Sequence, residues 1–133
     1  MDLTLAPNIL EQVIQHAKSL YPNEACGLLA GRNAAERFIP MTNISASAQE
    51  YEIDPAELIQ ALRHLRDSGE SLIAIFHSHP HGPAEPSNTD IRRAYYPEAA
   101  HLIVSLAELE RPQAAAFRII DGEALAIELR AIV

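Results

Sequence analysis

A run of six mostly apolar residues, Ser71–Phe76 (SLIAIF), is followed at once by a stiff polar segment. That segment, residues 77–90 (HSHPHGPAEPSNTD), contains three histidines, three prolines and one glycine. A short apolar run bounded by helix-stop and loop signals predicts a strand buried on both faces. Functional residues are common in the loop that follows such a strand. We therefore expect an interior strand over residues 72–76 and a functional loop at its end.

Three helices are predicted from apolar residues at helical spacing and from capping signals, over residues 9–20, 55–68 and 87–96. Asn8 and Glu11 have the form of a capping box at the start of the first helix. The second helix has a strong start, because Asp54 is a good N-cap and Pro55 suits the first helical position. Ser87 can cap the third helix.

Six further strands are predicted, over residues 3–5, 25–30, 36–41, 102–106, 114–120 and 124–132. The first of these reads as an edge strand, and Asp121-Gly122 is a good two-residue hairpin turn between the last two. This order of elements predicts an α/β or α+β fold, with a central mixed β-sheet flanked by helices. The length of 133 residues fits a single domain over residues 1–133.

Charge and cysteine content narrow the class of protein. The 10 Lys and Arg residues against 18 Asp and Glu give a formal net charge of −8, which disfavours a whole-surface nucleic-acid binder. The single cysteine, Cys26, rules out an intrachain disulfide and a cysteine-rich zinc site, and it fits a reducing compartment. No signal peptide is visible, and no apolar stretch approaches the roughly 20 residues that cross a bilayer. We therefore expect a cytoplasmic protein that does not associate with membranes.

His77, His79 and Asp90 form the pattern that carries chemistry. Residues i and i+2 of an extended chain point to the same side, so the two imidazoles can converge on one point. Asp90 lies at the start of a predicted helix, and the intervening loop can bring its carboxylate beside them. Two imidazoles and a carboxylate are a typical three-ligand catalytic zinc site with one position open for water. The sequence therefore predicts a metal site made by these three residues.

A bare pair of histidines two residues apart is weak evidence, because a histidine next to a core strand is more often structural. Here the pair is followed by Pro80, Ser87 and Asp90, so the whole pattern is H-S-H-P, six residues, then S-x-x-D. That pattern rarely arises by chance, and it favours the metal site over structural histidines.

His77-Ser78-His79-Pro80, Ser87 and Asp90 together resemble the signature of the JAMM (MPN+) metalloproteases. That signature also has an upstream glutamate, and Glu24 stands at the matching place. The resemblance implies a JAB/MPN-like, cytidine-deaminase-like architecture and a zinc metallopeptidase. The chain lacks the insertions of the longer deubiquitinating members, so it is similar to the short prokaryotic form of the JAB domain.

The expected catalytic residues are Glu24 and Ser87, and the expected metal ligands are His77, His79 and Asp90. Zinc acidifies water and polarises a carbonyl. Glu24 would take a proton from the attacking water and pass it to the leaving amine. Ser87 would donate a hydrogen bond to the oxyanion, in addition to its role as a helix cap. Taken without this context, Glu24 would read as a solvated loop carboxylate.

The resemblance also implies a substrate class. Short prokaryotic members act on ubiquitin-like proteins, including sulfur carriers, that end in Gly-Gly. A narrow groove suits such a tail, because only glycine lets the backbone approach so closely. The expected reaction is hydrolysis of a peptide or isopeptide bond after that tail. The alternative is an inactive MPN-like scaffold that binds proteins, although relatives of that kind typically lack one or more ligands.

Other zinc hydrolases fit less well. A base deaminase needs H-x-E and P-C-x-x-C, and a zincin needs H-E-x-x-H, none of which is present. Cys26 is interpreted as a small core residue and His81 as an exposed loop histidine or a neighbour of the site. The remaining histidines show no partner pattern. Arg92-Arg93 is interpreted as a solvated helix face that could also receive an acidic partner.

Overall fold

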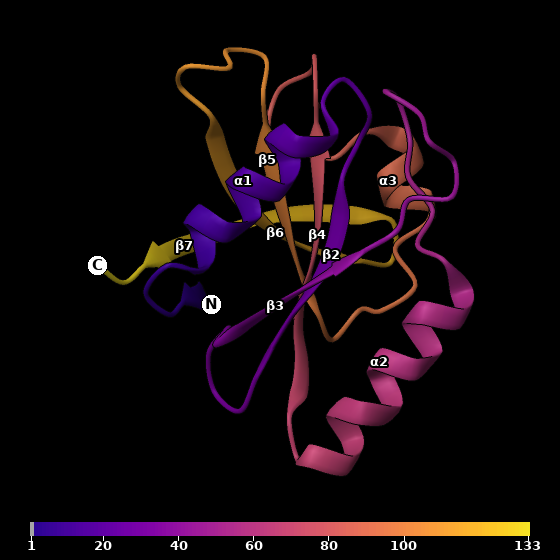
Figure 1. The fold of residues 1–133 in the computed structure, drawn as a ribbon, viewed down its shortest axis with the longest axis vertical. Coiled ribbons are helices and arrows are strands. Elements are labelled where there is room, and N and C mark those ends of the chain that lie inside the picture. The colour runs from indigo at the N-terminus through magenta and orange to yellow at the C-terminus, as the bar shows by residue number, and fades with distance from the viewer. Residues whose placement is uncertain (1) are drawn as a thin grey trace.

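The computed structural model describes residues 2–133, which form one curled mixed sheet and three helices (Figure 1). The strands are β1 (Asp2–Leu5), β2 (Cys26–Gly31), β3 (Arg37–Met41), β4 (Ser71–His79), β5 (Ala100–Ser105), β6 (Gln113–Ile120) and β7 (Glu123–Ala131). The helices are α1 (Ile9–Leu20), α2 (Pro55–Ser68) and α3 (Asn88–Arg92). The predicted fold class, a mixed sheet flanked by helices, is confirmed.

The strand order across the sheet is β1-β7-β6-β5-β4-β2-β3. The pairs β1–β7 and β4–β5 are parallel, and the other neighbours are antiparallel. Strand β1 lies at an edge and β4 lies inside, as predicted. β4 is longer than predicted, because it continues beyond Phe76 to His79 and stays paired with β5 up to that residue.

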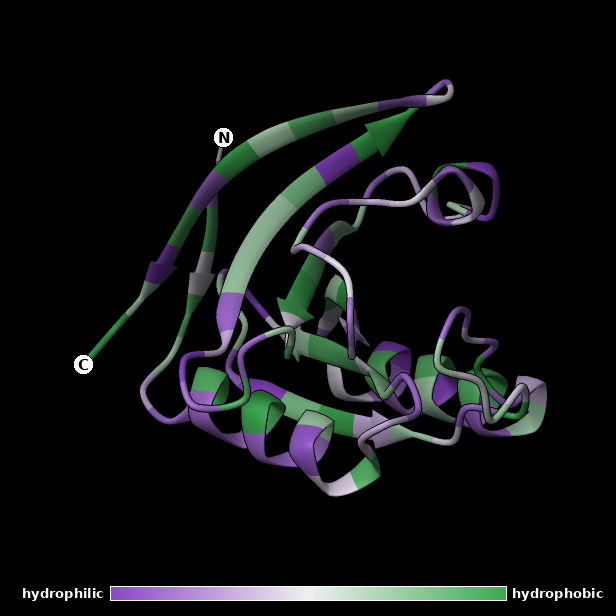
Figure 2. Ribbon diagram, turned by 90° about the horizontal axis from the view of Figure 1, so that it is seen from above, coloured by the Kyte–Doolittle hydropathy of each residue, from purple (hydrophilic) through white to green (hydrophobic). Residues whose placement is uncertain are grey.

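Two apolar clusters pack against the two faces of the sheet. The larger one joins α1, through Val13 and Ala17, to Phe76 of β4. The smaller one joins Ile75 of β4 to Leu58 of α2. Since successive strand residues point to opposite faces, His77 and His79 share the face of Ile75. The hairpin of β6 and β7 arcs away from the other strands (Figure 2).

The first two helices have the predicted bounds, but the capping box of α1 is wrong. Asn8 is left-handed, with φ 72°, and its side chain makes no capping hydrogen bond. Asn tolerates that conformation better than most residues. At α2, Asp54 accepts hydrogen bonds from the backbone N–H groups of Ala56 and Glu57, as predicted for an N-cap.

Helix α3 is shorter than predicted, ending at Arg92 and not near Tyr96. Tyr96 packs instead against the smaller apolar cluster, and Pro97 follows it, which disfavours helical backbone at Tyr96. The predicted cap is present, because Ser87 and Asp90 form a full capping box. Asp121 and Gly122 both have positive φ, so the predicted hairpin turn is confirmed.

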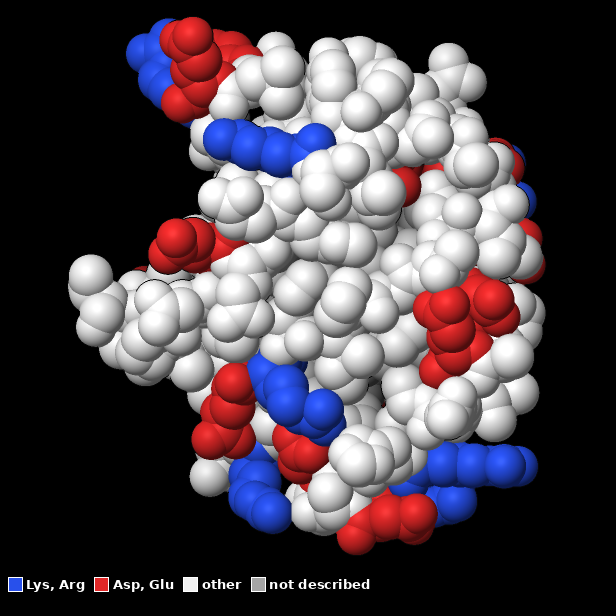
Figure 3. Space-filling model, in the orientation of Figure 1, with Lys and Arg blue, Asp and Glu red and all other residues white. Residues whose placement is uncertain are grey.

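The face seen in Figure 3 carries charges of both signs, and acidic and basic side chains lie side by side at its lower edge. Acidic side chains gather near the N-terminal end of α2, and basic side chains form no continuous patch on this face. No helix among residues 2–133 is long and apolar enough to cross a membrane.

Candidate metal centre

His77 and His79 lie at the end of β4, where the strand is held between β2 and β5. Cys26 and Ile103 are the partners of His77 in those strands. Both imidazoles are buried, and their Nε2 atoms are 3.0 Å apart. The structure thus brings the two rings to one point, as their spacing predicts.

Asp90 reaches the imidazoles from α3. Its Oδ2 accepts a hydrogen bond from the backbone N–H of Ser87 at 2.9 Å and lies 3.1 Å from Nε2 of both His77 and His79. Burial opposes ionisation of Asp90, but hydrogen bonds to the two histidines outweigh it and hold the pKa of Asp90 well below its usual range. The capping box therefore aims an ionised carboxylate at both imidazoles.

A backbone carbonyl sets the tautomer of His79. Its Nδ1 is 2.7 Å from the carbonyl oxygen of Pro83, which can only accept, so Nδ1 carries the proton. Nε2 is then left with a lone pair directed at His77 and Asp90, the arrangement typical of a metal-binding histidine. In the protonated ring Nε2 would instead donate to Asp90; burial opposes this protonation, but the resulting hydrogen bond to Asp90 and the one to Pro83 raise the pKa of His79.

His77 is held by packing. The ring of Tyr51 stacks on it, with centroids 4.5 Å apart and an interplanar angle of 21°. Its Nδ1 is buried and has no hydrogen-bond partner among residues 2–133. Burial lowers the pKa of His77, so its imidazole is neutral at pH 7. A neutral imidazole is the form that binds metals.

The backbone around Glu24 is fixed from three directions. The N–H of Ala25 donates to Oγ of Ser78 at 2.8 Å, and the N–H of Ser78 donates to the carbonyl of Ala25 at 3.0 Å. The N–H of Glu24 donates to the carbonyl of Ser47, and the side chain of Asn43 donates to the carbonyl of Glu24. Ser78, between the two histidines, therefore ties Glu24 to β4.

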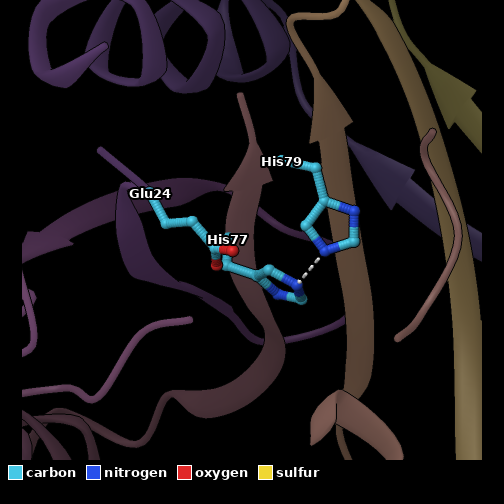
Figure 4. A group of neighbouring side chains, drawn as sticks. All are labelled: Glu24, His77 and His79. Carbon is cyan, nitrogen blue, oxygen red and sulfur yellow. Dashed lines mark hydrogen bonds between the residues drawn. The ribbon is translucent and has the colours of Figure 1, made fainter. Parts of the chain in front are cut away.

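The Glu24 side chain is only 3% exposed and lies beside the histidines (Figure 4). One ligand atom from each of Glu24, His77 and His79 lies within 4.8 Å of the others, so this group could hold a metal ion. Burial raises the pKa of Glu24 to about 8, with nearby Asp90 and Glu50 adding to the rise and His79 opposing it. Two carboxylates thus lie near the imidazole pair. Asp90 contacts both rings directly, whereas among the described residues Glu24 makes no hydrogen bond to either ring.

Ser87 lies beside this group at the start of α3. Its Oγ accepts the backbone N–H of Asp90 at 3.0 Å, which leaves the hydroxyl proton free to donate elsewhere. The structure therefore brings together all five residues predicted from the sequence: Glu24, His77, His79, Ser87 and Asp90.

Sequence reasoning missed a cavity of about 380 Å³ next to Asp90, which we name the side pocket. Its main walls are Tyr51, Ile53, Leu58, Ile75, Tyr96 and His101. These residues come from α2, β4, β5 and two loops, so no local pattern could have pointed to them. The carbonyl of Pro83 was missed because a backbone atom leaves no residue signature. Ser78 was visible only as the second letter of the histidine motif.

The weaker candidates lie outside the metal group. His81 makes an edge contact with Tyr21, with ring centroids 5.6 Å apart. His16 of α1 makes an edge contact with the ring of Phe38. Cys26 is buried, and burial raises the pKa of its thiol to about 12, so it is a core residue and not a nucleophile.

Residues 6–120 match the sequence model of a family described as prokaryotic homologs of the JAB domain. The chain is 36% identical over 123 residues to the CysO-cysteine peptidase of Mycobacterium tuberculosis, covering 90% of this chain and 84% of that one. It is 46% identical over 87 residues to the probable TtuB-protein conjugate cleaving protease of Thermus thermophilus, covering 65% and 59%. It is 33% identical over 111 residues to the desampylase of Haloferax volcanii, covering 77% and 80%.

Solved structures agree with these matches. A protein from Desulfitobacterium hafniense superposes with a TM-score of 0.88 at 36% identity, covering 99% of this chain and 93% of that one. A JAB1/MPN domain protein from Archaeoglobus fulgidus shares the fold, with a TM-score of 0.63 at 20% identity and coverage of 96% and 99%. On the match over residues 6–120, the chain belongs to the family of prokaryotic homologs of the JAB domain.

Proposed function

We propose that this chain is a JAMM-type zinc metallopeptidase. It hydrolyses a peptide or isopeptide bond after the Gly-Gly tail of a ubiquitin-like, sulfur-carrier type of protein. The observation that carries the proposal is the convergence of two imidazoles and a carboxylate, with a second, buried carboxylate beside them. Residues 1–133 then act as a single catalytic domain, and a cytoplasmic location stays a prediction of the sequence.

The donor set fits zinc. Ligands at the usual ~2.0–2.2 Å in a tetrahedron are about 3.3 Å apart. Here the Nε2 atoms of His77 and His79 and the Oδ2 of Asp90 are 3.0, 3.1 and 3.1 Å apart. Small outward movements of the three side chains would therefore admit the ion. Nitrogen and carboxylate donors suit zinc, and three protein ligands leave a fourth position open.

When bound, zinc would supply a Lewis acid that acidifies water and polarises the scissile carbonyl. Glu24 then transfers the proton of the attacking water. Its carboxylate takes a proton from the attacking water and delivers it to the leaving nitrogen. A group that both takes and gives a proton works best with a pKa near the working pH, and burial raises that of Glu24 toward it. The backbone clamp through Ser78 keeps this carboxylate in place.

Ser87 stabilises the charge that develops on the carbonyl oxygen. Its Oγ already accepts the N–H of Asp90, so its own proton is available for the oxyanion. Because Oγ is fixed by the capping box, this donor needs little reorganisation as charge develops.

The substrate class rests on the resemblance and on the names of relatives. One relative is named a CysO-cysteine peptidase and another a probable TtuB-protein conjugate cleaving protease. Both names describe cleavage of a bond that joins a named protein to cysteine or to another protein. A Gly-Gly tail suits a buried centre of this kind, because it brings no side chains to the metal.

The test is cleavage of fusions in which the host's ubiquitin-like sulfur carrier, ending in Gly-Gly, is followed by a short peptide. Zinc-loaded protein should release the carrier with a free Gly-Gly end, and a chelator should stop the reaction until zinc is returned. Glu24→Gln is the matched control, since it keeps the metal ligands. A scaffold would bind the carrier without cleaving it, and the variant would then behave like the wild type.

A further inference from the structure

The side pocket is continuous with the candidate metal centre. Asp90 lines the pocket, and its Oδ2 is 3.1 Å from the Nε2 atoms of both histidines. Tyr51 also belongs to both sites, because its ring stacks on His77 and forms part of the pocket wall. A group in the pocket is therefore next to the bond that is cleaved at the centre.

The pocket walls are apolar and carry little net charge. Ile53, Leu58 and Ile75 supply aliphatic surface, and Tyr51 and Tyr96 add rings. Two exposed side chains of opposite charge, Glu52 and Arg93, also line the pocket, and the ionised carboxylate of Asp90 adds a negative charge at the end next to the metal centre.

His101 of β5 is the polar member of the wall, and it is only 3% exposed. Burial lowers its pKa to about 4, so it is neutral at pH 7. A carboxylate inside this pocket would lose its water and lie near the like charge of Asp90, whereas an apolar group would lose no hydration.

The chemistry of the substrate determines which part of it can occupy the side pocket. Under the proposed function, the residues before the scissile bond are two glycines, which have no side chain to place in a cavity. A volume of about 380 Å³ is within the range of pockets that hold small ligands, and a glycine would leave it empty. The group that fills it must come from the other side of the bond, where the released amine is.

We propose that the side pocket binds the side chain of the residue that directly follows the scissile bond, and that it selects an apolar side chain there. The inference rests on the proposed function, because it places Gly-Gly on the carbonyl side of the bond. It adds a specificity site for the leaving group, and apart from Asp90 its lining residues have no assigned role in binding the metal or transferring the proton.

The first test is a series of carrier fusions that differ only in the residue X after Gly-Gly, with X as Gly, Ala, Leu or Asp. We expect kcat/KM for Leu to exceed that for Gly and for Asp by about 10-fold or more, the typical effect of filling an apolar pocket. Equal kcat/KM values for all four overturn this inference alone. Cleavage of none of them overturns the proposed function and this inference with it.

The second test narrows the pocket. Leu58→Trp places a large ring in the pocket wall and should reduce the ratio of kcat/KM for Leu to kcat/KM for Gly about 10-fold. Ile59→Trp is the matched control, because Ile59 is the next residue of α2, is 53% exposed and does not line the pocket. A Leu58→Trp protein that retains the wild-type preference for Leu contradicts the proposal.

A binding measurement on the wild type avoids dependence on how well a variant folds. Leucinamide, titrated into zinc-loaded protein with labelled methyl groups, should shift the methyl signals of Ile53, Leu58 and Ile75. The signal of Leu125, an exposed residue of β7 outside the pocket, should stay in place. Glycinamide should produce none of these shifts. Equal shifts with both amides, or none with leucinamide, contradict the proposal.

Discussion

The buried carboxyl of Glu24 predicts an unusual pH dependence of stability in the metal-free protein. Its folded-state pKa is about 8, against an ordinary 4.5, because burial disfavours the charged form. Between these values, the folded protein holds a proton that the unfolded chain has released. The stability that comes from this group is therefore complete below about pH 4.5 and is lost as the pH rises toward 8.

The magnitude follows from the two pKa values. Each pH unit between them changes the free energy of unfolding by about 1.4 kcal/mol, so by pH 7 the loss is about 3 kcal/mol. The variant Glu24→Gln has a similar shape and no charge, so it does not suffer this loss. Relative to wild type, its stability should rise by about 3 kcal/mol between pH 4.5 and pH 7, a shift of roughly 10 °C in Tm for a domain of this size.

The assay is urea unfolding of both proteins, with a chelator present, at half-unit steps from pH 4.5 to 8.5. The quantity that matters is the difference in unfolding free energy at each pH, because it cancels titrations that the two proteins share. The exposed Glu110→Gln variant is the matched control, and it should track wild type across the range. Zinc should reduce the pH-dependent difference, because a nearby cation favours the ionised form of Glu24.

A difference that stays constant with pH would refute the reasoning, since Glu24 would then be ionised in the folded state or open to water. If the unfolding free energy of the wild type instead rises relative to that of Glu24→Gln as the pH rises, Glu24 has a cationic partner in the folded protein. A constant offset between the two proteins reports packing alone, whereas a difference that changes with pH cannot come from packing, because packing differences do not titrate.

Five variants test the roles assigned to the site. His77→Ala and Asp90→Ala should each lose most of the roughly one zinc per chain found by elemental analysis, and full occupancy in both would refute the ligand assignment. Glu24→Gln should keep its zinc but lose about 10²–10⁴-fold in kcat, measured on the carrier fusion. Ser87→Ala should lose about 10²–10³-fold in kcat per bound zinc and also bind zinc less tightly, because the cap that aims Asp90 is removed. Ser78→Ala should cost about 1–3 kcal/mol in urea unfolding and lower kcat without changing zinc content, because Ala25, the residue after Glu24, loses its side-chain hydrogen bond to β4.

Local sequence patterns correctly predicted the elements in which the apolar pattern and the capping or turn signals indicate the same structure. The short apolar run before His77 favours only a buried strand. Asp54-Pro55 strongly favours a helix start at Pro55. Predictions failed where tertiary packing overrode a local signal. Tyr96 packs against the smaller apolar cluster and is not part of α3. β4 extends through His79 although its last three residues are polar.

The site was predictable for a different reason. His77, His79, Ser87 and Asp90 lie within 14 residues of sequence, so their spacing could be read directly. Glu24 is far away in sequence, and only the resemblance to a family pointed to it. The side pocket was invisible, because its walls meet only when α2, β4 and β5 are folded together.

The placement of polar atoms in the sheet argues that this centre exists for chemistry and not for stability. Oε1 of Glu24 and Nδ1 of His77 are both buried without a hydrogen-bond partner among residues 2–133. An unpaired buried polar atom costs about 1–3 kcal/mol, so two of them use up an appreciable part of the ~5–15 kcal/mol that stabilises a domain. Apolar side chains at these positions would pack beside Ile103 and Tyr51 without that cost. Two carboxylates gathered around two buried imidazoles at the end of β4 are therefore best explained by a task that only ionisable, metal-binding groups can perform.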